Sequence, residues 1–165
     1  MSHPLWKFLP SKQEEGSITD ILEKIPVFDQ ISRKDLLLID KILHKRNYNK
    51  GEPIFYEGEP GQGMYIIKRG DVEIFSEKKE RTTFATLGEG MFFGELSLLD
   101  GAPRSASAEA ASACELYGFF KPDLMELIDK KPELGSLILL NLGSVLGERL
   151  RMTNQQLTKM KSENA

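Results

Sequence analysis

Cysteine, histidine and long apolar runs are scarce in this sequence of 165 residues. The single cysteine, Cys114, cannot form a disulfide within the chain, which suits a reducing compartment. His3 and His44 have no neighbouring histidine, cysteine or spaced carboxylates, so the sequence does not support a zinc or iron site. No apolar stretch approaches the ~18 residues of a membrane span, and the N-terminus shows no secretion signal. We therefore expect a cytoplasmic protein with no metal and no membrane association.

A strong excess of one charge is also missing. The chain has 22 Lys and Arg residues against 25 Asp and Glu, for a net charge of −3 at pH 7. Nucleic-acid-binding domains usually carry a basic patch or stripe, so we expect no nucleic-acid partner. An anionic ligand would need a local positive site, because the overall field does not attract it. The length suits one domain with a real core and short appendages.

The central region, residues 45–120, consists of short apolar runs separated by glycines. These runs lie at 53–56, 64–67, 72–75 and 82–87. Short runs at roughly 8–12-residue spacing between glycine turns are typical of a small all-β sandwich or barrel. Within the third run, alternation places Val72 and Ile74 on one face of a strand and Glu73 and Phe75 on the other.

Helices are expected on both sides of this β region. Apolar residues at 18, 21, 22 and 25 share one helical face, which Pro26 should end. A second helix begins after Ser32, a good N-cap residue, and continues to about His44. After the β region, Pro122 stands in the first turn of a short helix over 121–131.

A last helix is expected from about Glu133 toward Lys159. Its first half is apolar nearly all round, so we expect it to be packed on more than one side. An apolar seam then runs through Leu142, Leu146, Leu150, Thr153, Leu157 and Met160. This spacing suits a helix–helix dimer, but a helix packed on the β region of its own chain gives the same pattern, and the sequence leaves both open.

The stretch 93–108 concentrates groups that could bind an anion. Gly94 allows close approach of the backbone, and free N–H groups at the start of the next helical turn favour negative charge. Glu95 could accept hydrogen bonds from hydroxyls, while Arg104 could return as a bidentate clamp. The implied ligand carries a phosphate-like group and at least one hydroxyl. The alternative is a turn in which Glu95 and Arg104 form a surface ion pair.

Residues 93–97 (Phe-Gly-Glu-Leu-Ser) and 101–106 (Gly-Ala-Pro-Arg-Ser-Ala) closely resemble the phosphate-binding cassette of cyclic-nucleotide-binding domains. The glycine-punctuated runs also resemble the β-roll of this family, so the likeness covers about residues 18–155. The resemblance implies an α+β fold. An eight-stranded antiparallel, jelly-roll-like β-roll is flanked by N-terminal helices and a long C-terminal helix. Because no catalytic constellation accompanies the motif, we expect a binding module and not an enzyme.

The resemblance also implies a set of ligand-binding residues in the cassette: Phe93, Gly94, Glu95, Leu96, Ser97, Arg104, Ser105 and Ala106. In the family, backbone N–H groups at the positions of Leu96 and Ser97 hold the cyclic phosphate. The arginine pairs with its exocyclic oxygens, and the glutamate accepts from the ribose 2′-OH.

The final helix is expected to help to read the base. Residues 148–154 resemble the corresponding segment of catabolite activators, where an Arg and a Thr-Ser pair approach the nucleotide. Arg149 and Thr153 match this pattern, but Asn154 replaces the serine. Ser105 does not decide between the purines, because the family has Ser or Thr there with either base. We favour cAMP over cGMP as the ligand and expect no cofactor.

We therefore expect an arm or linker over 1–16 and a cyclic-nucleotide-binding domain over 17–160. Helices occupy 18–44, the β-roll 45–120 and the C-terminal helices 121–160. The expected function is a stand-alone regulatory module that repositions its C-terminal helices toward an unidentified downstream protein. A homodimer through the last helix is open. Alternatives are a cGMP-binding module, the sensor half of a catabolite-activator-type regulator without its DNA-binding domain, and an interaction domain that binds no ligand.

Overall fold

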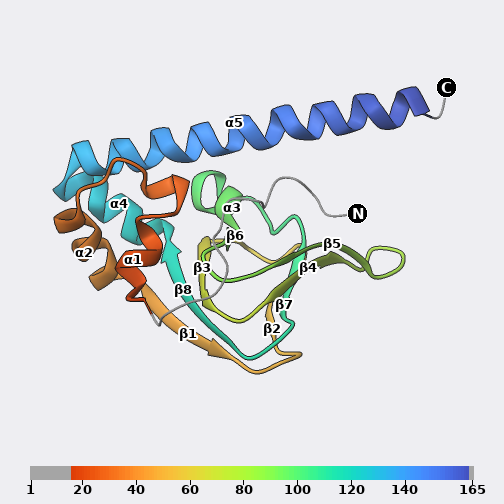
Figure 1. The fold of residues 1–165 in the computed structure, drawn as a ribbon, viewed down its shortest axis with the longest axis horizontal. Coiled ribbons are helices and arrows are strands. Elements are labelled where there is room, and N and C mark those ends of the chain that lie inside the picture. The colour runs from red at the N-terminus through yellow and green to blue at the C-terminus, as the bar shows by residue number, and fades with distance from the viewer. Residues whose placement is uncertain (1–15, 164–165) are drawn as a thin grey trace.

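The computed structural model describes residues 16–163, and the expected arm lies outside them except for Gly16. Within this range, eight strands form two antiparallel four-stranded sheets, with helices before and after them in the chain (Figure 1). The elements in chain order are α1 (Ile18–Leu22), η2 (Pro26–Phe28), α2 (Arg33–Ile42), β1 (His44–Tyr48), β2 (Pro53–Phe55), β3 (Gly63–Arg69), β4 (Val72–Ser76), β5 (Thr82–Leu87), β6 (Phe92–Phe93), α3 (Glu95–Asp100), β7 (Ser107–Ala110), β8 (Cys114–Phe120), α4 (Lys121–Lys130) and α5 (Pro132–Glu163). The expected β-roll with flanking helices is confirmed.

The two sheets share one apolar interior. Their strand orders are β1-β8-β3-β6 and β2-β7-β4-β5. A buried cluster joins them, with Ile67 and Leu116 from the first sheet and Val72 and Leu87 from the second. Burial of side chains of this size stabilises the fold by about 1.5–3 kcal/mol each. The glycine-separated apolar runs of the sequence are therefore the strands that enclose this core.

The predicted alternation along β4 is confirmed. Val72 and Ile74 face the cluster between the sheets. On the opposite face, the guanidinium of Arg81 lies 3.7 Å from the centre of the Phe75 ring and forms an ion pair with Glu73. The charged turn between β4 and β5 therefore folds one of its cations back over the outer face of the strand.

The N-terminal helices cover one end of the first sheet, and both begin at serine N-caps. Ser17 forms a capping box in α1, and the hydroxyl of Ser32 accepts from the N–H of Asp35 in α2. The first helix was predicted over 18–25, but α1 is shorter and ends at Leu22. Ile25 is still buried, but its backbone is extended as it enters η2. The second helix ends at Ile42, and His44 begins β1 instead of ending a helix.

The C-terminal helices are arranged as the prolines indicated. Pro122 lies in the first turn of α4, and Pro132 begins α5, whose 32 residues span about 48 Å. The start of α5 packs on α4 and η2, and its buried residues there include Ile138 and Leu142. Its other end extends over the side of β4 and β5 (Figure 1). No helix within residues 16–163 is long and apolar enough to cross a bilayer.

Candidate functional site

The short helix α3 follows a glycine with a left-handed backbone conformation. Gly94 is its N-cap, with φ at +79°, and Gly101 is its C-cap, with φ at +66°. A Cβ atom on Gly94 would lie 2.6 Å from Nη1 of Arg104 and 3.1 Å from the carbonyl oxygen of Gly63. Only glycine meets both the backbone and the packing requirement. The first N–H groups of α3 have no acceptor within the helix and belong to the predicted cassette.

Arg104 is a buried cation, with only 7% of its surface exposed. Its Nη1 donates to the carbonyl oxygens of Gly63 at 2.7 Å and Gly94 at 3.2 Å. Its guanidinium carbon lies 4.1 Å from the centre of the Phe55 ring. Burial lowers the pKa of this guanidinium.

The guanidinium of Arg104 forms no ion pair within residues 16–163, and Glu59 and Glu95 act on it only from a distance. Its Nε is buried and has no hydrogen-bond partner among residues 16–163, and no carboxylate in that range hydrogen-bonds to its guanidinium. A buried charge without a counter-charge is costly. The arrangement can therefore accept an anion, whose oxygens would supply the missing partners.

Glu95 is the first residue of α3 and is only 5% exposed. Its carboxylate forms an ion pair with Nη1 of Arg149 on α5. The Arg149 guanidinium also lies 5.0 Å from the centre of the Phe92 ring. The alternative of a surface ion pair between Glu95 and Arg104 is therefore wrong. The cassette carboxylate is instead connected to the C-terminal helix.

A cavity of about 300 Å³ lies between the β-roll, α3 and α5. Its strand side is mostly apolar and includes Phe55, Ile74, Phe84, Ala85, Leu87 and Phe92. The polar side contains the predicted cassette residues: Phe93, Gly94, Glu95, Leu96, Ser97, Arg104, Ser105 and Ala106. An apolar cavity with a few convergent polar groups is the usual form of a small-molecule site, and its size lies at the lower end of that class.

Two cassette residues differ in their accessibility. Leu96 is 46% exposed, whereas Ser97 is buried. The hydroxyl of Ser97 donates to the carbonyl oxygen of Ala102, so it supports the turn after α3. A Cβ atom on Gly61 would come within 2.1 Å of this hydroxyl oxygen, which requires a glycine there. The backbone N–H of Ser97, and not its hydroxyl, is therefore the group available to a ligand.

Only one of the three ligand-binding residues predicted on the final helix lies at the cavity. Arg149 lines the cavity, but Thr153 and Asn154 do not. Thr153 is exposed and donates to the carbonyl oxygen of Arg149 within the helix at 2.8 Å. Gln156, which the sequence reasoning missed, lies at the cavity with Arg149. The seven-residue spacing of these two residues on one helix face was the only available signal.

His44 and Cys114 do not line this cavity, and His3 lies outside the described residues. His44 contacts both carboxylate oxygens of Asp123, at 3.1 and 3.2 Å. Cys114 is buried, and burial raises the pKa of its thiol. Residues 16–163 contain no group of three or more His, Cys, Asp or Glu side chains placed to hold a metal ion.

Comparison with known proteins identifies related chains. The family model described as cyclic nucleotide-binding domain matches residues 45–131. The cyclic AMP receptor protein of Thermus thermophilus is 37% identical over 142 residues, which cover 85% of this chain and 64% of that protein. The chain spans less than two thirds of the length of the first curated relatives that it matches.

Two solved structures show the same architecture. The catabolite activator protein of Thermus thermophilus superposes with a TM-score of 0.74 at 36% identity, covering 82% of this chain and 63% of that one. A cyclic nucleotide-binding domain from Methylobacillus flagellatus superposes with a TM-score of 0.76 at 27% identity, covering 87% of this chain and 82% of that one.

Proposed function

The chain belongs to the cyclic nucleotide-binding domain family, and on this basis we propose that it is a regulatory module that binds cAMP beneath α5. The observation that carries this proposal is Arg104, a buried guanidinium whose Nε has no hydrogen-bond partner and which forms no ion pair within residues 16–163. A cyclic phosphate carries one negative charge and two exocyclic oxygens, so it supplies both the missing charge and the missing acceptors.

The other cassette groups fit the remaining parts of the ligand. The N–H groups of Leu96 and Ser97 open α3 beside the cavity and can donate to the phosphate. The carboxylate of Glu95 accepts from the ribose 2′-OH, which distinguishes cAMP from a 2′-deoxy analogue. Small side chains at Ser105 and Ala106 leave room for the sugar. Residues 17–160 constitute the domain that performs this binding.

The ion pair between Glu95 and Arg149 suggests how binding is transmitted. A ribose hydroxyl that approaches Glu95 shares the carboxylate with the guanidinium on α5. Binding therefore changes the contacts of α5 with the β-roll, and a ligand that prefers one arrangement shifts the population toward it. The repositioned helix is the signal to a downstream protein.

The outer part of α5 supports a homodimer. Leu142, the start of the predicted seam, is buried in the core of its own chain. Leu150, Leu157 and Met160 are 61%, 50% and 60% exposed. Leu150 and Leu157 lie two turns apart on one helix face, and pairing with a second copy of α5 would bury them.

A second function is favoured by the relatives. The CRP-like cAMP-activated global transcriptional regulator of Mycobacterium tuberculosis aligns with this chain over only 62% of its own length. The same module can therefore serve as the sensor half of a transcription regulator, with α5 as the element that transmits the signal. Both functions require the same ligand site.

Calorimetric titration with cAMP tests the ligand assignment. We expect Arg104→Ala to weaken cAMP binding by about 100-fold or more, because loss of one partner of a buried charge pair costs about 3–5 kcal/mol. Arg104→Lys keeps the charge but loses the planar fork and should bind at an intermediate strength.

Arg46→Ala is the matched control. Arg46 is an exposed cation on β1, and its Nη1 donates to the backbone oxygen of Lys45. Its removal should leave cAMP binding unchanged, while thermal unfolding confirms that each variant is folded. An unchanged Kd in Arg104→Ala would remove the basis of the phosphate assignment.

A further inference from the structure

The side chain of Gln156 faces the cavity from α5. It lies seven residues after Arg149, which is two helical turns and about 10 Å along the axis. Its amide has no hydrogen-bond partner within the described part of the chain. An amide offers one acceptor and two donors, so this cavity wall presents polar groups that no residue of 16–163 satisfies.

Phe84 faces the same cavity from β5. Thr83 and Ala85 pair with Phe75 and Ile74 on β4, so Phe84 is the extra residue of a β-bulge. Bulges commonly re-aim a side chain. Phe84 is 48% exposed although it lines the cavity. Its aromatic surface is therefore available to a flat ligand group.

Both residues lie beyond the phosphate and sugar groups of the site. Glu95 on α3 lies opposite Arg149 on α5, because the two side chains form an ion pair. Gln156 lies about two helical turns further toward the C-terminus of α5. The end of β5 that joins the β4–β5 turn and the C-terminal half of α5 extend to the same side of α3 (Figure 1). A purine attached to a sugar at Glu95 would extend into this part of the cavity.

We propose that Gln156 reads the base of the bound nucleotide as adenine and that Phe84 provides its stacking surface; this inference rests on the proposed function. The Hoogsteen edge of adenine presents the N6 amino donor beside the N7 acceptor, and a glutamine amide pairs with both. The same edge of guanine presents two acceptors, O6 and N7, which leaves the amide oxygen of Gln156 without a donor.

This assignment differs from the pattern expected from the sequence. Thr153 and Asn154 lie outside the cavity, and the Thr153 hydroxyl is used by the helix backbone. Base selection is therefore assigned to Gln156, which shares the cavity-facing side of α5 with Arg149.

Parallel titrations with cAMP and cGMP test the proposal on the full chain. Gln156→Leu keeps the size of the side chain and removes both hydrogen-bonding groups. We expect cAMP binding to weaken about tenfold, within the range of about 5- to 150-fold that a bidentate amide–base pair supplies. Binding of cGMP should change much less, so the preference for cAMP falls.

Gln155→Leu is the matched control, because Gln155 is exposed and does not line the cavity. It should leave both affinities unchanged. Phe84→Ala should weaken both nucleotides by a similar factor of about ten, since stacking does not depend strongly on the base.

The outcomes separate this inference from the proposed function. If the unmodified chain binds neither nucleotide, the proposed function fails and the base assignment fails with it. If the unmodified chain binds cAMP but Gln156→Leu retains the same ratio of affinities, only the base assignment is overturned. A ratio that changes in Thr153→Ala or Asn154→Ala, and not in Gln156→Leu, also overturns it.

Discussion

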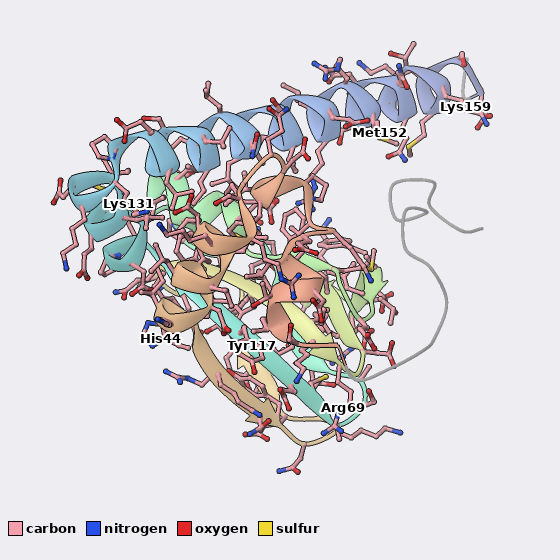
Figure 2. The ribbon with its side chains drawn as sticks, turned by 60° about the vertical axis from the view of Figure 1, so that its left-hand side comes forward. His44, Arg69, Tyr117, Lys131, Met152 and Lys159 are labelled. Atoms are coloured by element: carbon pink, nitrogen blue, oxygen red, sulfur yellow. The ribbon has the colours of Figure 1, made fainter. Side chains whose placement is uncertain are left out.

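The two halves of α5 are held to the molecule in different ways. In the first half, residues 132–145, Leu134, Ile138 and Leu142 are buried in the main core cluster. The side chain of Asn141 also donates to the carbonyl oxygens of Val27 and Asp29, at 3.2 and 2.9 Å. No residue in the second half, 146–163, is buried to this degree, and its contacts include the ion pair of Arg149 with Glu95 (Figure 2 shows Met152 and Lys159 on this half).

The proposed signalling by α5 requires such a difference between its two halves. Burial of each large apolar side chain contributes about 1.5–3 kcal/mol, so the first half cannot leave the core at moderate cost. The second half has no buried large apolar side chain, and its contacts with the rest of the molecule include the ion pair of Arg149 with Glu95 at the cavity. A ligand that alters those contacts can move the second half while the first half stays in place.

The largest expected effect comes from the buried half. Ile138→Ala should lower the free energy of unfolding by about 3 kcal/mol, because it removes buried methyl and methylene groups and leaves a cavity. Leu150→Ala in the exposed half should change it by less than about 0.5 kcal/mol. Urea denaturation measures both values. Equal losses in the two variants would contradict the comparison.

A substitution on the exposed half should act on assembly instead of folding. Leu150→Glu with Leu157→Glu places charges in the proposed dimer seam and should weaken self-association by about 2 kcal/mol, near 30-fold. Sedimentation velocity over a range of concentrations measures this change. Gln155→Glu adds a charge on the other side of the helix and should leave self-association unchanged. A chain that is monomeric before substitution would rule out the seam.

The hydrogen bonds of Asn141 should have an intermediate effect. Asn141→Ala leaves two carbonyl groups of the η2 region without their side-chain donor and should cost about 1–2 kcal/mol. Hydrogen exchange should show faster opening around η2 but not at the second half of α5. Ser144→Ala, an exposed change one turn further along, is the control and should have no measurable effect.

The smallest expected effect concerns the residue just before α5. Lys131 donates to Asp35 at 2.7 Å, and this hydrogen bond, with one from Ser32, lowers the pKa of the Asp35 carboxyl. Because the folded pKa is depressed, the stabilisation is present above about pH 4 and is lost as the pH falls through the folded value.

Comparison with Asp35→Asn isolates the contribution of the Asp35 carboxylate to the free energy of unfolding. The unmodified chain should exceed the variant by about 0.5 kcal/mol near pH 7, since the pair is partly exposed. Urea denaturation of both proteins near pH 7 and near pH 3 measures the difference at each pH. The difference should shrink toward zero at the lower pH, and a larger difference in acid would contradict the sign of the pKa shift.

Much of the fold was predictable because its signals are local. The N-cap at Ser32, the proline at the start of α4 and the glycine-separated strands each reflect constraints within a few residues. The ends of α1 and α2 were missed by two or three residues, because helix propensity continues there while tertiary packing turns the chain. Ile25 shows this, since it is buried as expected but not helical.

The candidate site likewise combines features set by neighbouring residues with features set by tertiary packing. The sequence by itself determined the cassette, since Gly94, Glu95 and Arg104 are close in the chain and their backbone and charge requirements can be read from residue types. Only the tertiary structure decided which side of α5 faces the cavity. Arg149 and Gln156 meet Phe84 and Glu95 across 54 to 72 residues of chain, by docking of the helix on the core. Helical periodicity defines which residues share a face, but the rotation of the docked helix depends on all the side chains beneath it.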